Sequence, residues 1–136
     1  MNLLLNIDVP DLQAAVAFYT QAFDLRVGRH LFDGEVVVLL GAPAPIYLLA
    51  KAAGSPACAG SAQLRDYQRH WTPLHLDILV DDLDAALARA LAAGARQEGA
   101  IGSASWGRLV GLSDPFGHGL CLLQWQGRGY DEITGV

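Results

Sequence analysis

Apolar and polar residues alternate along two short stretches that lie half a chain apart. In residues 3–9 every second residue is Leu, Ile or Val, and residues 74–80 show the same alternation. A period of two is typical of a β-strand that packs on one face only. The sequence therefore predicts that each half of the chain opens with a strand.

A helix is predicted directly after each of these strands. Asp11 and Asp82 precede the two runs, and an aspartate at this position accepts hydrogen bonds from free N–H groups of the first helical turn. Gly94 is expected to end the second helix, because glycine adopts the left-handed cap conformation without steric cost. The apolar residues that recur at helical spacing are Leu12, Ala15, Val16, Tyr19 and Phe23 in the first run and Leu83, Ala86, Leu87, Ala90 and Leu91 in the second.

Three further strands are expected after each helix. Apolar, β-branched stretches alternate there with turn-forming residues; Asp33-Gly34 is typical of a hairpin, and residues 114–119 form a turn by composition. The expected strands are residues 26–32, 35–40 and 45–50 in the first half and residues 96–101, 108–113 and 119–126 in the second.

The two halves are copies of one unit. Residues 9–17 and 80–88 are identical at six of nine positions, an offset of 71 residues. Units this small bury their apolar faces by packing on their twin. We therefore expect one α+β domain over residues 1–136, made of two βαβββ modules at about 1–51 and 71–128, with a cupped mixed sheet and helices on its outer face. Residues 52–70 form the expected linker, in which residues 63–70 are predicted to be a short helix.

Composition excludes several classes of partner. The formal charge is −5 and the nine basic residues are scattered, so the chain carries no pattern for binding nucleic acid. Apolar runs are shorter than the roughly 18 residues of a membrane span, which favours a cytoplasmic protein without membrane contact. Cys58 and Cys121 show no metal-binding spacing and are expected to be reduced thiols.

Motifs in both halves carry a family resemblance. They are residues 74–86 (Leu-His-Leu-Asp-Ile-Leu-Val-Asp-Asp-Leu-Asp-Ala-Ala), Gly94-Ala95, Asp114-Pro115-Phe116-Gly117-His118, Val9-Pro10-Asp11-Leu12 and Phe18-Tyr19. Together they resemble the vicinal oxygen chelate superfamily of glyoxalases, bleomycin-resistance proteins and extradiol dioxygenases. The resemblance covers nearly the whole chain outside the linker. It implies the same two-module fold and a cupped site for a small molecule.

The resemblance also implies where metal ligands would lie. Metal-dependent members carry His or Gln on the first strand of each module and Glu on the last. His75 occupies the first-strand position of the second module, whereas the matching residue of the first module is Leu4, which has no donor atom. The last-strand positions hold Tyr47 and Cys121 in place of the carboxylate. We therefore expect no metal and no other cofactor, with a divalent metal as the alternative.

Other residues are candidates for contacting a ligand. Asp77 shares a strand face with His75, and an arginine such as Arg108 is suited to anchor an anion. Aromatic faces suit a planar ligand, and Trp125 shares strand parity with Cys121. His75 is the best candidate for a catalytic role. The predicted ligand-binding residues are His75, Asp77, Tyr47, Trp106, Arg108, Cys121 and Trp125.

Three functions stay open on the sequence. The first is metal-free sequestration or transport of an amphipathic or aromatic molecule by a homodimer, as the resemblance to bleomycin-resistance proteins implies. The second is a glyoxalase-like lyase or isomerase, or a dioxygenase, in which His75, Arg108 or Tyr47 polarises a substrate oxygen. The third is an accessory dimerising module whose cleft is filled by its own side chains, such as Leu4, Leu79 and Leu123.

Overall fold

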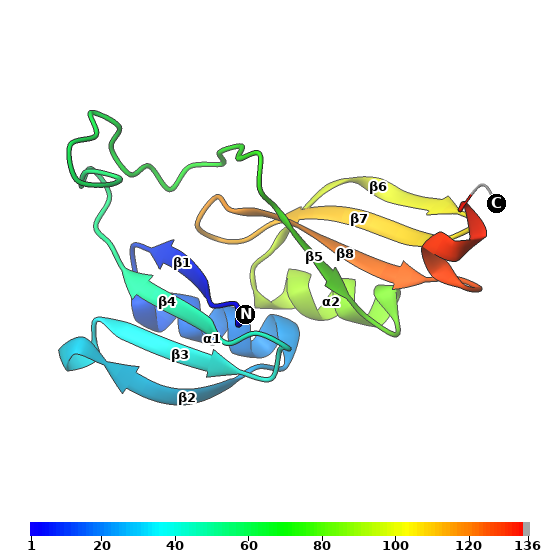
Figure 1. Ribbon diagram of the computed structural model, residues 1–136, viewed down its shortest axis with the longest axis horizontal. Coiled ribbons are helices and arrows are strands. Elements are labelled where there is room, and N and C mark those ends of the chain that lie inside the picture. The colour runs from blue at the N-terminus through cyan, green and yellow to red at the C-terminus, as the bar shows by residue number, and fades with distance from the viewer. Residues whose placement is uncertain (135–136) are drawn as a thin grey trace.

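Two modules of the same topology make up the protein, which we describe for residues 1–134 from a computed structural model (Figure 1). Each runs strand, helix and three strands, as the repeat predicts. The first contains β1 (Leu5–Val9), α1 (Leu12–Phe23), β2 (Arg26–Leu31), the 3-10 turn η1 (Phe32–Gly34), β3 (Val36–Leu40) and β4 (Ile46–Ala50). The second contains β5 (Leu76–Leu79), α2 (Leu83–Ala93), β6 (Arg96–Ala104), β7 (Gly107–Ser113), β8 (Gly119–Trp125) and the 3-10 turn η2 (Gly129–Glu132).

The strands of each module form a four-stranded mixed sheet. The order is β1-β4-β3-β2 in the first module and β5-β8-β7-β6 in the second. In both sheets the first and last strands pair in parallel, and the other neighbours are antiparallel. The first and last strands of a module therefore lie side by side, so residues far apart in the sequence share one stretch of sheet surface.

Both helices begin, and α2 ends, where the sequence predicts. The carboxylate of Asp11 accepts a hydrogen bond from the N–H of Ala14 at 2.9 Å, and Asp82 accepts one from Ala85 at 3.0 Å. Gly94 ends α2 with a positive φ of 116°, the conformation that glycine reaches most easily. These caps fix the helices directly after their strands.

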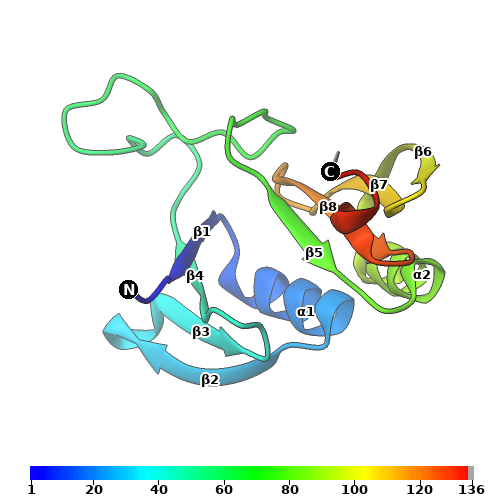
Figure 2. The ribbon, with the colours of Figure 1, turned by 45° about the vertical axis from the view of Figure 1, so that its right-hand side comes forward.

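One hydrophobic core joins the two modules. Helices α1 and α2 pack against each other, and each covers one face of the sheet of its own module (Figure 2). Across this junction the Tyr19 hydroxyl of α1 donates a hydrogen bond of 2.6 Å to the buried carboxylate of Asp114 in the β7–β8 turn. Burial and this neighbouring carboxylate raise the pKa of Tyr19 well above its ordinary value, so the hydroxyl remains a donor.

The linker differs from its prediction. Residues 63–70 form no helix and run as an irregular segment with bends at residues 68 and 69. Arg65 explains this, because its guanidinium donates to the carboxylate of Asp8 at 2.7 Å and to linker carbonyls, contacts that outweigh local helix propensity. The Asp33-Gly34 turn does connect β2 to β3, but through η1. Within the described residues, no helix is long and apolar enough to cross a membrane.

Candidate functional site

Each sheet has one face that the helices cover and one that they leave open. On β8 the buried Leu120 and Leu122 belong to the helix-covered core, so the intervening Cys121 lies on the opposite face. The same alternation places Asp77 of β5, its register partner, on that face beside Cys121. We call this surface the open face of the second sheet.

Residues 67–72 of the linker pass over one end of this open face, and we call them the covering segment. Gly117 permits its close approach, because a Cβ at that position would lie 2.1 Å from the carbonyl oxygen of Gln68. Similarly, a Cβ on Gly119 would lie 2.6 Å from the Arg69 guanidinium. The N–H of His70 donates to the carbonyl of Gly117 at 3.2 Å. The covering segment therefore packs directly against two glycines of the second module.

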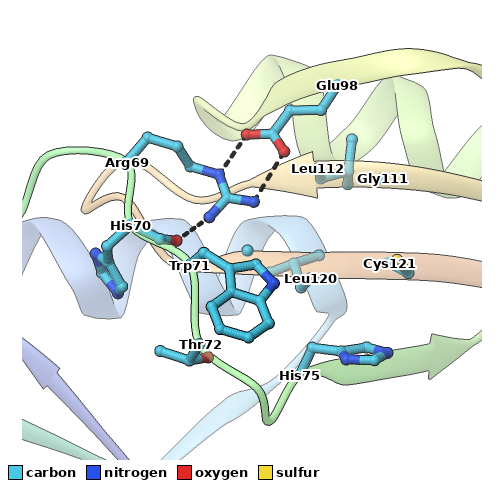
Figure 3. Close-up of a pocket in the computed structure, with 11 residues that line it drawn as sticks. Arg69, His70, Trp71, Thr72, His75, Glu98, Gly111, Leu112, Leu120 and Cys121 are labelled. Atoms are coloured by element: carbon cyan, nitrogen blue, oxygen red, sulfur yellow. Dashed lines mark hydrogen bonds and ion pairs between the residues drawn. The ribbon is translucent and has the colours of Figure 1, made fainter.

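A pocket of about 250 Å³ lies between the covering segment and the open face, and we call it the outer pocket (Figure 3). The covering segment forms one wall, and strands β6, β7 and β8 supply the others together with His75, which precedes β5. The lining residues are Arg69, His70, Trp71, Thr72, His75, Glu98, Gly111, Leu112, Gly119, Leu120 and Cys121.

An arginine–glutamate pair forms the edge of the outer pocket nearest β6. Arg69 donates two hydrogen bonds to the carboxylate of Glu98, at 2.5 and 3.0 Å. This bidentate contact lowers the pKa of Glu98 and keeps the arginine charged. Both side chains are about 40% exposed, so solvent screens the pair and a charged ligand group can compete for either partner.

His75, Asp77 and Cys121 lie together at the opposite edge. The His75 Nε2 atom is 3.6 Å from a carboxylate oxygen of Asp77. Burial raises the pKa of the Cys121 thiol, and the charge and hydrogen bond of Asp77 raise it further. At neutral pH this thiol is therefore protonated, which disfavours both nucleophilic attack and metal binding by Cys121.

The donor atoms here do not fit a divalent metal. His75 is the one strong donor at the positions that the family resemblance marks, since Leu4 has none and the thiol of Cys121 resists ionisation. Among residues 1–134, no three side chains of His, Cys, Asp or Glu are grouped to hold an ion.

The structure brings some of the predicted ligand-binding residues together at the outer pocket and places the others elsewhere. His75 and Cys121 line the outer pocket, and Asp77 contacts both. Tyr47 lies instead on the open face of the first sheet, in register with Asn6 and Val38. Trp106 and Trp125 lie beyond the pocket, where both pack on Tyr130 of η2 with ring centroids 5.1 and 4.6 Å away.

Arg108 requires a correction. It shares strand parity with the core residue Val110 and therefore lies on the helix-covered side of β7. There its guanidinium donates to the carboxylate of Asp84 in the first turn of α2, at 2.8 and 3.1 Å. It forms an ion pair with the helix and does not face the pocket.

Sequence reasoning missed the covering segment. Arg69 and His70 fall in the expected linker, Trp71 and Thr72 lie beside it, and Glu98 reads as an ordinary strand residue. A signal existed, because arginines, a histidine and a tryptophan interrupt an otherwise small-residue linker at positions 65–71. Side chains of that size are unnecessary in a flexible connector and indicate a segment that packs.

A second cavity of about 320 Å³ adjoins the outer pocket and lies between the modules. Both are bordered by His70, Thr72 and His75, and the second extends to Asn6 and Asp8 of β1. The covering segment therefore lies between the outer pocket and the second cavity and contributes side chains to the lining of each.

The fold matches solved structures over almost the whole chain. FosX, a genomically encoded fosfomycin resistance protein from Listeria monocytogenes, superposes with a TM-score of 0.69 at 18% identity, covering 93% of each chain. A glyoxalase/bleomycin resistance protein/dioxygenase family enzyme from Burkholderia phytofirmans gives 0.71 at 18% identity, covering 90% of this chain and 97% of its own. Lactoylglutathione lyase from Agrobacterium tumefaciens gives 0.61 at 19%, covering 100% and 97%. At these identities the likeness establishes the fold.

Sequence comparison agrees with the structural one. Uncharacterized proteins of Mycobacterium bovis and Mycobacterium tuberculosis are each 32% identical over 114 residues, which is 81% of this chain and 74% and 66% of theirs. The sequence model of the glyoxalase-like domain matches residues 5–123, which include both modules and the linker between them. The chain therefore belongs to the glyoxalase-like domain family.

Proposed function

We propose that this protein binds an amphipathic small molecule with a flat apolar group in the outer pocket, and that it sequesters or carries this ligand without a metal. The observation that carries the proposal is Trp71, whose side chain is 81% exposed at the wall of a pocket that also contains charged groups. A large aromatic surface left in water beside a pocket is a ready contact for a ligand ring.

The rest of the pocket suits a ligand with both apolar and polar parts. The protonated Cys121 offers a small apolar contact on the open face, while His75 offers one donor and one acceptor in its neutral form. Arg69 and Glu98 offer opposite charges that a polar group on the ligand can engage. The pocket volume of about 250 Å³ lies just below the roughly 300–1,000 Å³ of drug-sized sites, which favours a compound of one or two rings.

The metal-free part of the proposal rests on the donor set. A catalytic divalent ion is typically held by three protein ligands, and this chain places a leucine and a protonated thiol where the resemblance implies ligands. A ligand would therefore be held by stacking and hydrogen bonds.

Fragment binding tests this function. In chelator-treated buffer, saturation-transfer NMR with one- and two-ring aromatic acids and amines should identify binders. Trp71→Ala should weaken them by about tenfold, because a stacking contact contributes roughly 0.5–1.5 kcal/mol beyond the apolar area that is also lost. Phe32→Ala is the matched control, since Phe32 is 75% exposed and lies outside the pocket. No binders, or equal affinity in Trp71→Ala, would contradict the proposal.

An enzymatic function is the second candidate, favoured by the proximity of His75 and Asp77. A carboxylate beside an imidazole can orient the ring for general acid–base chemistry. Turnover of a bound fragment-like substrate that His75→Ala abolishes would favour this alternative. Binding without turnover favours sequestration. The homodimer expected from the resemblance stays a prediction, which light scattering at micromolar concentrations tests.

A further inference from the structure

A pair of histidines holds the covering segment between the two modules. The Nε2 atom of His70 lies 3.0 Å from the Nδ1 atom of His118, which is in the β7–β8 turn. The outer nitrogens face backbone carbonyls: Nδ1 of His70 is 2.9 Å from the oxygen of Gln68, and Nε2 of His118 is 2.7 Å from the oxygen of Asp8 in β1. The chain of contacts thus joins linker, second module and first module.

Counting protons shows what this geometry requires. A carbonyl oxygen only accepts hydrogen bonds, so both outer nitrogens must carry a proton. The inner contact between two nitrogens needs one proton more. Three protons on four ring nitrogens give the pair one net positive charge. If both rings are neutral, they share two protons, and one lone pair then faces another across one of the three contacts.

The surroundings of the pair accommodate a single positive charge. Asp114 accepts a hydrogen bond of 2.9 Å from the N–H of His118, and its carboxylate has no cationic partner among the described ion pairs. Arg65 and Arg69 face the carboxylates of Asp8 and Glu98, and Arg96 of β6 borders a cavity together with Asp114. The charged and titratable groups packed around the pair are Asp8 of β1 with its partner Arg65, Asp114 of the turn, Tyr19 of α1, Tyr67 and Arg69 of the covering segment with Glu98, and His75 before β5.

We propose that His70 and His118 form a clasp that closes only when the pair carries one proton more than two neutral imidazoles. The clasp then holds the covering segment, and with it the wall of the outer pocket, only within a limited pH range. Loss of the extra proton leaves one contact repulsive. A fourth proton places two N–H groups against each other. The clasp therefore opens on both the acidic and the alkaline side.

The direction in which pH changes stability follows from how many protons each state binds. We count the protons bound in excess of those that two neutral rings carry, in the unfolded chain and in the closed clasp. On the acidic side the unfolded chain binds two such protons and the closed clasp one, so stability rises with pH. On the alkaline side the unfolded chain binds none and the closed clasp one, so stability falls with pH. The contribution of the clasp to stability therefore depends on pH as a bell-shaped curve.

Ring-nitrogen NMR on the unmodified, ligand-free protein tests the proton count. At the maximum, long-range proton–nitrogen spectra should show both outer nitrogens protonated and a single proton on the inner pair of nitrogens. Two neutral rings, each with one protonated nitrogen at every pH from about 5 to 8, would overturn the proposal. The readout needs no ligand, so its failure is separate from failure of the binding function.

Variants test the consequence for the covering segment. In His70→Gln the amide still donates to His118 but cannot carry charge. The difference in urea midpoint between wild type and this variant should be bell-shaped with pH.

Amide exchange in residues 67–72 of wild type should become about fivefold faster on both sides of the maximum, which corresponds to one lost hydrogen bond. His30→Gln, at an exposed position of β2, is the control and should give a flat difference. A flat difference for His70→Gln would also overturn the clasp.

Discussion

Replacement of Asp114 by alanine is expected to lower the free energy of unfolding by about 3 kcal/mol or more. The Asp114 carboxylate is 2% exposed and accepts three hydrogen bonds, from the Tyr19 hydroxyl and from the N–H groups of Phe116 and His118. Alanine leaves all three donors without a partner in the interior, and each unsatisfied donor costs roughly 1–3 kcal/mol unless water reaches it. Urea denaturation followed by circular dichroism measures the change.

Two further variants test which contacts account for this loss of stability. Asp84→Ala removes an exposed carboxylate from a surface ion pair and should change stability little. Tyr19→Phe should destabilise the protein by about 1.5–3 kcal/mol, the usual contribution of a hydrogen bond to a charged group. In the double variant the two effects should be far from additive, because they share one contact between the modules. Additive effects would show that the Tyr19–Asp114 bond does not join the modules.

Gly117→Ala is expected to detach the covering segment and to destabilise the protein by about 2–4 kcal/mol. Gly117 has a φ of 86°, which disfavours any residue with a Cβ, and the added methyl group would lie 2.1 Å from the carbonyl oxygen of Gln68. Backbone cannot move aside as a flexible side chain does. The hydrogen bond from His70 to Gly117 should be lost, and the fluorescence of the neighbouring Trp71 should change.

Gly60→Ala separates backbone strain from displacement of the segment. Gly60 has a comparable φ of 75°, but a Cβ there would have no other atom within 4 Å, so alanine adds strain without a clash. Gly60→Ala should lower the free energy of unfolding by about 1 kcal/mol and leave amide exchange in residues 67–72 unchanged. Equal effects of the two substitutions would contradict the close packing of the linker on Gly117.

The fold could be predicted largely because its signals are local. The alternation in β1 and β5, the aspartate caps and Gly94 each act within a few residues, so propensity and burial agree. The repeat then supplied the long-range information that one sequence normally lacks. Strand bounds differ from the expectation by only a few residues, as at β6, which extends to Ala104.

The site was less predictable because it depends on packing across the chain. Strand parity correctly related His75, Asp77 and Cys121, since neighbouring parallel strands bring them together. It could not show that a linker folds back over them. The predicted helix at residues 63–70 is absent because long-range contacts of Arg65 and close approach to Gly117 hold this segment in an irregular conformation. Arg108, which we expected to contact the ligand, lies away from the outer pocket, as its strand parity with Val110 indicates.

Elemental analysis tests the central claim, that the outer pocket works through its own side chains. Purified, untagged protein and His75→Ala would be dialysed against nickel, zinc, iron and manganese, then against metal-free buffer, before measurement. We predict only trace metal in both proteins, because His75 lacks the ligand partners that a divalent ion needs. Near-stoichiometric metal in the wild type that is lost in His75→Ala would contradict the account and make metal-dependent chemistry of the glyoxalase type the function to test.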